Sequence, residues 1–98
     1  TAVRLDKKSF EANFGLGRCR FDQGNYKQAE RHFKDARDID RQKTASYEYL
    51  MMCYQQLDQI KDLKKTWDQY RGIADQADIS KLRSDARFAA AIRTAESQ

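Results

Sequence analysis

The feature that most constrains the fold of this chain is a weak internal repeat of 34 residues. Apolar and small side chains recur at intervals of three and four residues, and a second stripe with the same spacing follows 34 residues later. Each stripe forms one apolar face of an amphipathic helix. The paired positions are Tyr26 and Ile60, Ala29 and Leu63, Phe33 and Trp67, and Ala36 and Tyr70. A repeat of this length predicts stacked helical units, each too small to bury its apolar face alone.

The remainder of the chain also favours helices. The 98 residues include no proline and four glycines, and the period-two alternation typical of strands is missing. The same offset matches Leu16 with Leu50 and Cys19 with Cys53. We therefore expect an all-α protein.

The charge pattern favours a solvated helical surface. Lysine and arginine number 19 against 15 aspartate and glutamate residues, a formal net charge of +4, and the two signs are interleaved. A nucleic-acid interface more often gathers its basic side chains into one stripe. Nucleic-acid binding is therefore a remote alternative, and the salt dependence of binding would separate it. No apolar stretch approaches the roughly 20 residues of a membrane-spanning helix.

No combination of side chains indicates an enzyme or a metal site. The single histidine, His32, shares its helix face with no second histidine or cysteine. Gly15 and Gly17 lie within a helical pattern and follow no strand, so they do not form a phosphate-binding loop. No nucleophile is paired with a base. We expect no catalytic residue, no metal and no cofactor.

Cys19 and Cys53 occupy equivalent positions in the two repeats. Equivalent atoms in stacked helices lie roughly 8–10 Å apart or more, whereas a disulfide needs Cα atoms within about 7 Å. We expect two free thiols that act as small buried apolar residues.

Residues 10–43 also carry small and aromatic side chains in a recognisable order. They are Leu16-Gly17, Gly24, Tyr26, Ala29, Phe33 and Ala36. This order resembles the tetratricopeptide repeat, whose helical hairpins are 34 residues long. Residues 44–77 resemble a second, degenerate unit in which Met51 and Asp58 replace glycines. The resemblance implies antiparallel helix-turn-helix repeats, with small residues where the two helices approach closely.

The resemblance further implies a right-handed α-solenoid that is a fragment of a longer array. Residues 2–9 align with residues 36–43, so we expect residues 1–9 to end the second helix of a preceding repeat. Residues 78–98 do not complete another unit, and we expect them to form a C-terminal capping helix, as solenoids require. Ser84 is a candidate cap for a shorter version of that helix.

In this family the first helices line a concave groove that holds peptides. The resemblance therefore implies a non-catalytic scaffold for protein–protein interaction that binds a peptide or protein segment. The matching groove positions in this chain are Phe14, Arg18, Phe21, Glu48, Tyr49, Met52 and Gln55. The alternative is a structural role, in which the groove is filled internally and the array self-associates through its N-terminal face.

Overall fold

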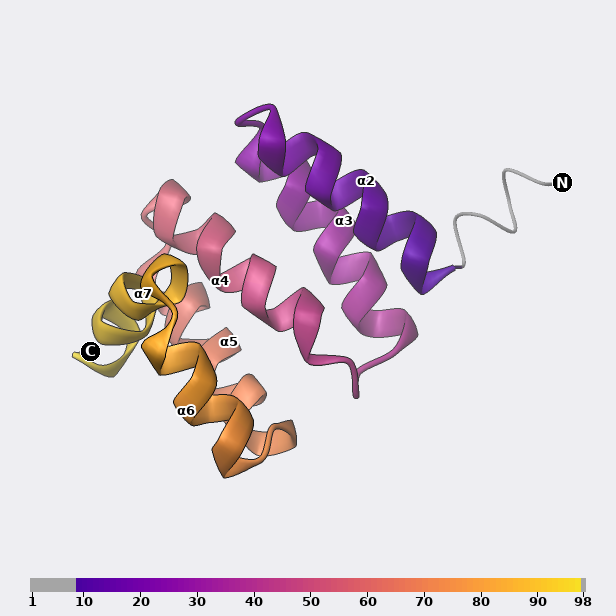
Figure 1. Ribbon diagram of the computed structural model, residues 1–98. Helices are drawn as coiled ribbons and strands as arrows, with labels where there is room; N and C mark the ends of the chain where they lie inside the picture. Colours follow the sequence, from indigo (N-terminus) through magenta and orange to yellow (C-terminus); the bar gives the residue numbers. More distant parts are fainter. Residues whose placement is uncertain (1–8, 98) are drawn as a thin grey trace, which may run out of the picture.

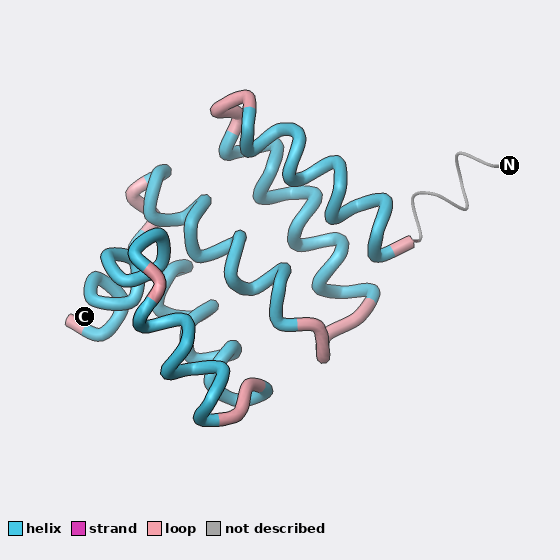
Figure 2. The backbone as a smooth tube through the Cα atoms, in the orientation of Figure 1, coloured by secondary structure: helices cyan, strands magenta, loops and turns pink. Residues whose placement is uncertain are grey.

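The structure, a computed structural model, describes residues 9–97. This part of the chain forms six helices and no strand, which confirms the all-α prediction (Figures 1 and 2). The helices are α2 (Phe10–Asp22), α3 (Tyr26–Ile39), α4 (Thr44–Leu57), α5 (Ile60–Ile73), α6 (Gln76–Ser84) and α7 (Ala86–Glu96).

The first four helices form two hairpins, α2–α3 and α4–α5, that pack in chain order (Figure 1). Helix α3 contacts both α2 and α4, so the hairpins are joined through it. Helices α2 and α4 begin at Phe10 and Thr44, and helices α3 and α5 begin at Tyr26 and Ile60. Both pairs of helix starts are 34 residues apart, in register with the sequence repeat.

A serine sets the start of the first hairpin. The side chain of Ser9 accepts a hydrogen bond from the backbone N–H of Ala12 at 3.3 Å, and its own backbone is extended. Such a cap satisfies one of the free N–H groups at a helix start. Ser9 therefore caps α2. Residues 1–8, the rest of the expected preceding unit, lie outside the described residues.

Small residues allow close packing within the first hairpin. A Cβ atom on Gly17 would lie 2.7 Å from the Phe33 ring, so only glycine lets α2 and α3 approach this closely. The turn after α2 uses Gly24, with φ of +80°, a conformation that side chains disfavour. The equivalent turn of the second hairpin places Asp58 in the left-handed region, with φ of 59°.

The core lies mainly along α3, α4, α5 and α7. Its largest fully buried apolar side chains are Trp67, Tyr70, Phe33, Leu50, Met51, Leu63 and Ile92. Helix α7 packs against α4, α5 and α6 and so covers the last hairpin. The guanidinium groups of Arg71 and Arg83 lie 5.6 and 5.5 Å from the centre of the Trp67 ring, and Arg83 also pairs with Glu96 of α7.

The single helix expected over residues 78–98 is two helices in the structure. Asp75 caps the start of α6, and the helix is interrupted at Asp85. The Asp85 carboxylate accepts a hydrogen bond from the Arg87 backbone N–H at 2.9 Å and so caps the start of α7. The cap of α7 is thus Asp85 and not Ser84. The break lets Leu82 and Phe88 both reach buried positions, from α6 and α7 respectively.

The two cysteines have different environments. Both are free thiols, but Cys19 is exposed and Cys53 is buried, so the expectation that both are buried was wrong for Cys19. The two thiols differ in exposure because a neighbouring helix covers only one of them. Cys53 of α4 lies near Glu30 of α3, whereas no described helix covers the equivalent side of α2.

Candidate protein-binding groove

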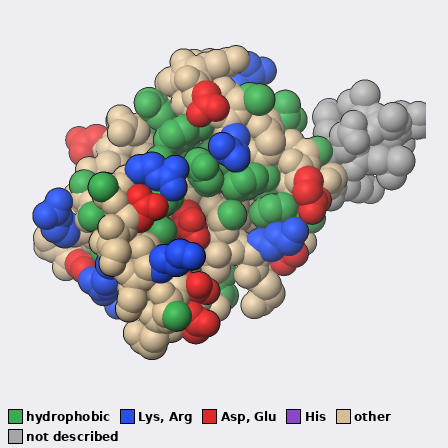
Figure 3. All heavy atoms as spheres, in the orientation of Figure 1, with side chains coloured by type: hydrophobic (Ala, Val, Ile, Leu, Met, Phe, Trp, Pro, Cys, Tyr) green, Lys and Arg blue, Asp and Glu red, His purple; other side chains and the backbone are tan. Residues whose placement is uncertain are grey.

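Four of the predicted groove residues form one cluster between α2 and α4. The centre of the Tyr49 ring lies 5.3 Å from that of Phe14 and 5.7 Å from that of Phe21, in edge-to-face contacts. The guanidinium carbon of Arg18 lies 5.6 Å from the centre of the Tyr49 ring. Figure 3 shows hydrophobic side chains gathered on the face that α2 and α4 share, with charged groups around them. We call Phe14, Phe21 and Tyr49 the aromatic floor.

The aromatic floor is half-buried, because its rings also pack against the core. Phe33, which is fully buried, lies 5.4 Å from Phe14 and stacks on Tyr49 at 5.2 Å between ring centres. Arg18 is exposed. The cluster thus presents ring surface and a guanidinium group to any segment that lies across it, while its inner side supports the fold.

The sequence reading missed two residues at the edge of the floor. Phe10 stacks on Phe14 with ring centres 5.5 Å apart. The Lys43 ammonium lies 4.5 Å from the Phe10 ring centre and 3.3 Å from a carboxylate oxygen of Glu11. The signal was present, since Phe10 precedes Phe14 by four residues and therefore shares its helix face.

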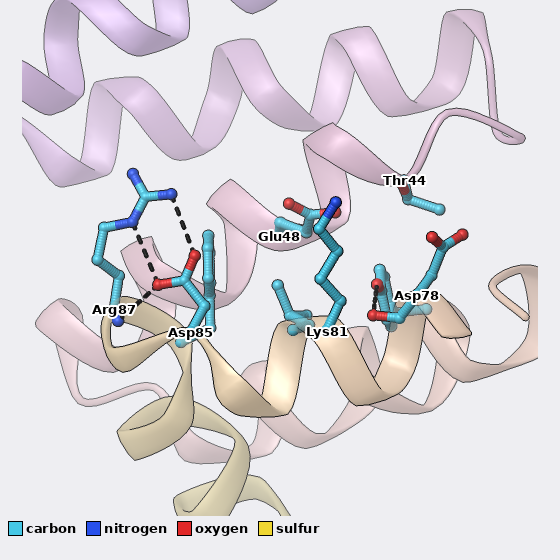
Figure 4. Close-up of a pocket in the computed structure, with 9 residues that line it drawn as sticks. Thr44, Glu48, Asp78, Lys81, Asp85 and Arg87 are labelled. Carbon is cyan, nitrogen blue, oxygen red and sulfur yellow. Dashed lines mark hydrogen bonds and ion pairs between the residues drawn. The ribbon is translucent and has the colours of Figure 1, made fainter. Parts of the chain in front are cut away.

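Glu48 lies outside the aromatic cluster and lines a cavity between α4 and α6 (Figure 4). The cavity has a volume of about 250 Å³. Its walls are formed by Thr44, Glu48, Tyr70, Asp78, Lys81, Leu82, Asp85, Arg87 and Phe88. The side chains of Arg87 and Asp85 pair with each other at 3.3 Å. The sequence did not predict this cavity, because a single helix over residues 78–98 includes no separate α6 beside α4.

Electrostatics within the cavity disfavour the ionised form of Glu48. Partial burial raises the pKa of its carboxyl group, and the negative charges of Asp78 and Asp85 raise it further. Hydrogen bonding from Thr44 and the positive charge of Arg87 oppose this shift. Beside it, burial raises the pKa of Tyr70 to about 12, and the Tyr70 hydroxyl donates a hydrogen bond to the Asp78 carbonyl at 3.3 Å.

The last two predicted groove residues lie further along α4. Met52 is half-buried and packs against the core. The side-chain oxygen of Gln55 is buried and accepts no hydrogen bond within the described part of the chain. The structure thus unites Phe14, Arg18, Phe21 and Tyr49, gives Glu48 to the adjoining cavity, and leaves Met52 and Gln55 beyond them on α4.

These features define an all-α protein of consecutive helical hairpins, with an aromatic cluster and a charged cavity along α2, α4 and α6. No family model matches the chain, and a search of curated proteins returns no relative. Within residues 9–97, no group of three or more His, Cys, Asp or Glu side chains is placed to hold a metal ion. No helix of this part is long and apolar enough to cross a membrane.

Proposed function

We propose that this protein is a non-catalytic scaffold whose hairpins are units of a right-handed, tetratricopeptide-like solenoid, and that it binds a peptide or protein segment along α2, α4 and α6. The observation that carries the proposal is the exposed Arg18 above the half-buried aromatic floor. The 34-residue register of the helix starts and the contact between Gly17 and Phe33 support the repeat architecture.

The physical basis is the unequal distribution of contact energy in protein interfaces. Aromatic and arginine side chains dominate that energy when a partner excludes water from them. Here Phe14, Phe21 and Tyr49 are already held in place by their packing on the core, so binding costs them little side-chain entropy. A segment with apolar side chains would cover the rings, and its polar backbone or an acidic group would pair with Arg18.

The test begins with selection of binders to the whole chain from a phage-displayed library of random peptides. The affinity of each selected peptide is then measured by fluorescence anisotropy. Arg18→Ala should weaken binding by about tenfold, since a hydrogen bond to a charged group contributes about 1.5–3 kcal/mol. The matched control is Arg31→Ala, which removes an exposed arginine from α3 and should leave the affinity unchanged.

Arg18 is a sharper probe than Phe14. Truncation of Phe14 should also weaken peptide binding, but Phe14 packs on the buried Phe33, so the same change would loosen the core. Equal affinities for wild type and Arg18→Ala, or equal losses for Arg18→Ala and Arg31→Ala, would remove the aromatic floor as the binding surface. Failure to select any peptide would contradict the scaffold function itself.

A second candidate function is self-association through α2. Leu16 is 45% exposed, whereas its repeat equivalent Leu50 is 0% exposed. A second copy could cover Leu16 and the neighbouring Cys19, and the internal packing of the aromatic floor on Phe33 also fits this structural role. Sedimentation equilibrium should then show a dimer that Leu16→Glu converts to a monomer. A wild-type chain that stays monomeric at all accessible concentrations would exclude this role.

A further inference from the structure

The cavity between α4 and α6 is lined by buried apolar side chains and by acidic ones. Tyr70, Leu82 and Phe88 are 1%, 6% and 2% exposed, and they form its base. Glu48 of α4 and Asp78 and Lys81 of α6 also line the cavity, and the Lys81 side chain points toward Glu48 (Figure 4). Such a site matches an amphipathic side chain, with a hydrocarbon stem and a charged end.

The charges of the cavity are unbalanced. Of the three carboxylates, only Asp85 forms an ion pair with a described residue, and its partner is Arg87. Neither Glu48 nor Asp78 forms an ion pair within residues 9–97, and Lys81 forms none with them. Two unpaired carboxylates therefore face one ammonium group, which leaves an excess of one negative charge in a partly desolvated site.

We propose that this cavity is a subsite for one lysine or arginine side chain of the bound segment, with Glu48 as its anchor. This inference rests on the proposed function. The stem of the guest side chain lies over Leu82 and Phe88, and its cationic end pairs with Glu48 and Asp78. A charge-assisted hydrogen bond in a half-buried site is stronger than one in open water. It also offsets the repulsion that Glu48 experiences from its two acidic neighbours.

The position of Glu48 connects the cavity to the aromatic floor. Glu48 and Tyr49 are adjacent on α4, and Tyr49 lies under Arg18. One extended segment can therefore place an apolar side chain on the floor and a basic side chain in the cavity. The partner so defined carries a basic residue close to an apolar or aromatic one.

An acidic guest fits the cavity less well. Arg87 is already held by Asp85, so an incoming carboxylate would find only Lys81 and would meet Glu48 and Asp78 with the same charge. Lys81 instead competes with a basic guest for the two carboxylates. Removal of the Lys81 ammonium therefore distinguishes a basic guest side chain from an acidic one.

The experiment uses the peptides selected on the wild-type chain. Their basic residue is replaced by norleucine, which keeps an unbranched stem and removes the charge. This change should weaken binding to wild type by about tenfold, and should have little effect on binding to Glu48→Gln. Glu48→Gln alone should weaken the unmodified peptide by a similar factor. Lys81→Ala should leave the affinity unchanged or increase it.

Each outcome decides between the proposals. Selected peptides that bind wild type and Glu48→Gln equally, or that tolerate norleucine, would overturn the subsite and leave the scaffold function standing. Weaker binding to Lys81→Ala would show an anionic guest and would also overturn it. If no peptide is selected, the scaffold function fails and the subsite fails with it. Thermal unfolding verifies that Glu48→Gln is folded, and the norleucine comparison on wild type does not depend on any variant.

Discussion

The two hairpins occupy equivalent positions in the repeat but differ in what surrounds them. Leu16 and Cys19 of α2 are exposed, whereas their equivalents Leu50 and Cys53 of α4 are fully buried. Helix α4 packs between α3 and α5, whereas α2 packs mainly against α3 and meets α4 through the rings of the aromatic floor. The comparison teaches that the repeat specifies which side chains can be buried, and that an adjacent helix decides which of them are.

The hairpins also differ in how their paired helices meet. In α2–α3 the Phe33 ring presses against Gly17, and an added Cβ would clash with it. In α4–α5 the equivalent positions hold Met51 and Trp67, both buried. Two large side chains fill the second interface, whereas a glycine and one ring fill the first. Equivalent interfaces in the two hairpins are therefore filled by side chains of different volume.

The largest expected difference between the hairpins is thiol reactivity. Burial raises the pKa of Cys53 from 9.0 to about 12, which lowers its thiolate fraction by about a thousandfold. Iodoacetamide should therefore label Cys19 quickly and Cys53 only after unfolding. Peptide mapping by mass spectrometry over a time course measures both rates, with a sample in denaturant as the control. Equal labelling of the native protein would contradict the comparison, and an internal disulfide in the non-reduced protein would refute it outright.

The next difference concerns the paired leucines. Leu50→Ala should lower the free energy of unfolding by about 2–5 kcal/mol, because it leaves a cavity in the core. Leu16→Ala should change it by no more than about 0.5 kcal/mol in the monomer. Urea unfolding followed by circular dichroism measures both values. Similar losses at the two positions would mean that another part of the protein, or a second copy, covers α2 in solution.

The smallest of these effects compares two glycines of α2. Gly17→Ala should lower the free energy of unfolding by about 1–3 kcal/mol, since its Cβ would lie 2.7 Å from the Phe33 ring. Gly15→Ala is the matched control, because no atom lies within 4 Å of its added Cβ. There the better helix propensity of alanine should stabilise the protein by about 0.5–1 kcal/mol. If both changes stabilise the protein, α2 and α3 are not in the close contact described.

Much of the fold could be predicted because it depends on local spacing. The stripes that begin at Tyr26 and Ile60 predicted two helices, and both helices start at those residues. The break at Asp85 could not be predicted as readily. A helix through residue 85 and a capped break there are both compatible with the local sequence, and the burial of Leu82 and Phe88 on separate helices depends on α4 and α5.

The candidate site divides in the same way. Residues spaced along one helix, such as Phe14, Arg18 and Phe21, could be placed together from their periodicity. The meeting of Phe14 with Tyr49 across two helices followed from the repeat resemblance, since the chain positions are far apart. The cavity beside Glu48 could not be found from sequence, because it requires the separate direction of α6.

The sequence by itself determined that this chain is helical, where α2, α3, α4 and α5 begin, and which face of each is apolar, because these properties depend on residues within about one turn of each other. Only the tertiary structure decided that Cys53 is buried and Cys19 is not, that Phe33 meets Gly17, and that Glu48 faces Asp78 and Lys81. Those outcomes depend on distances between separate helices, and such distances are set by the packing of the whole core.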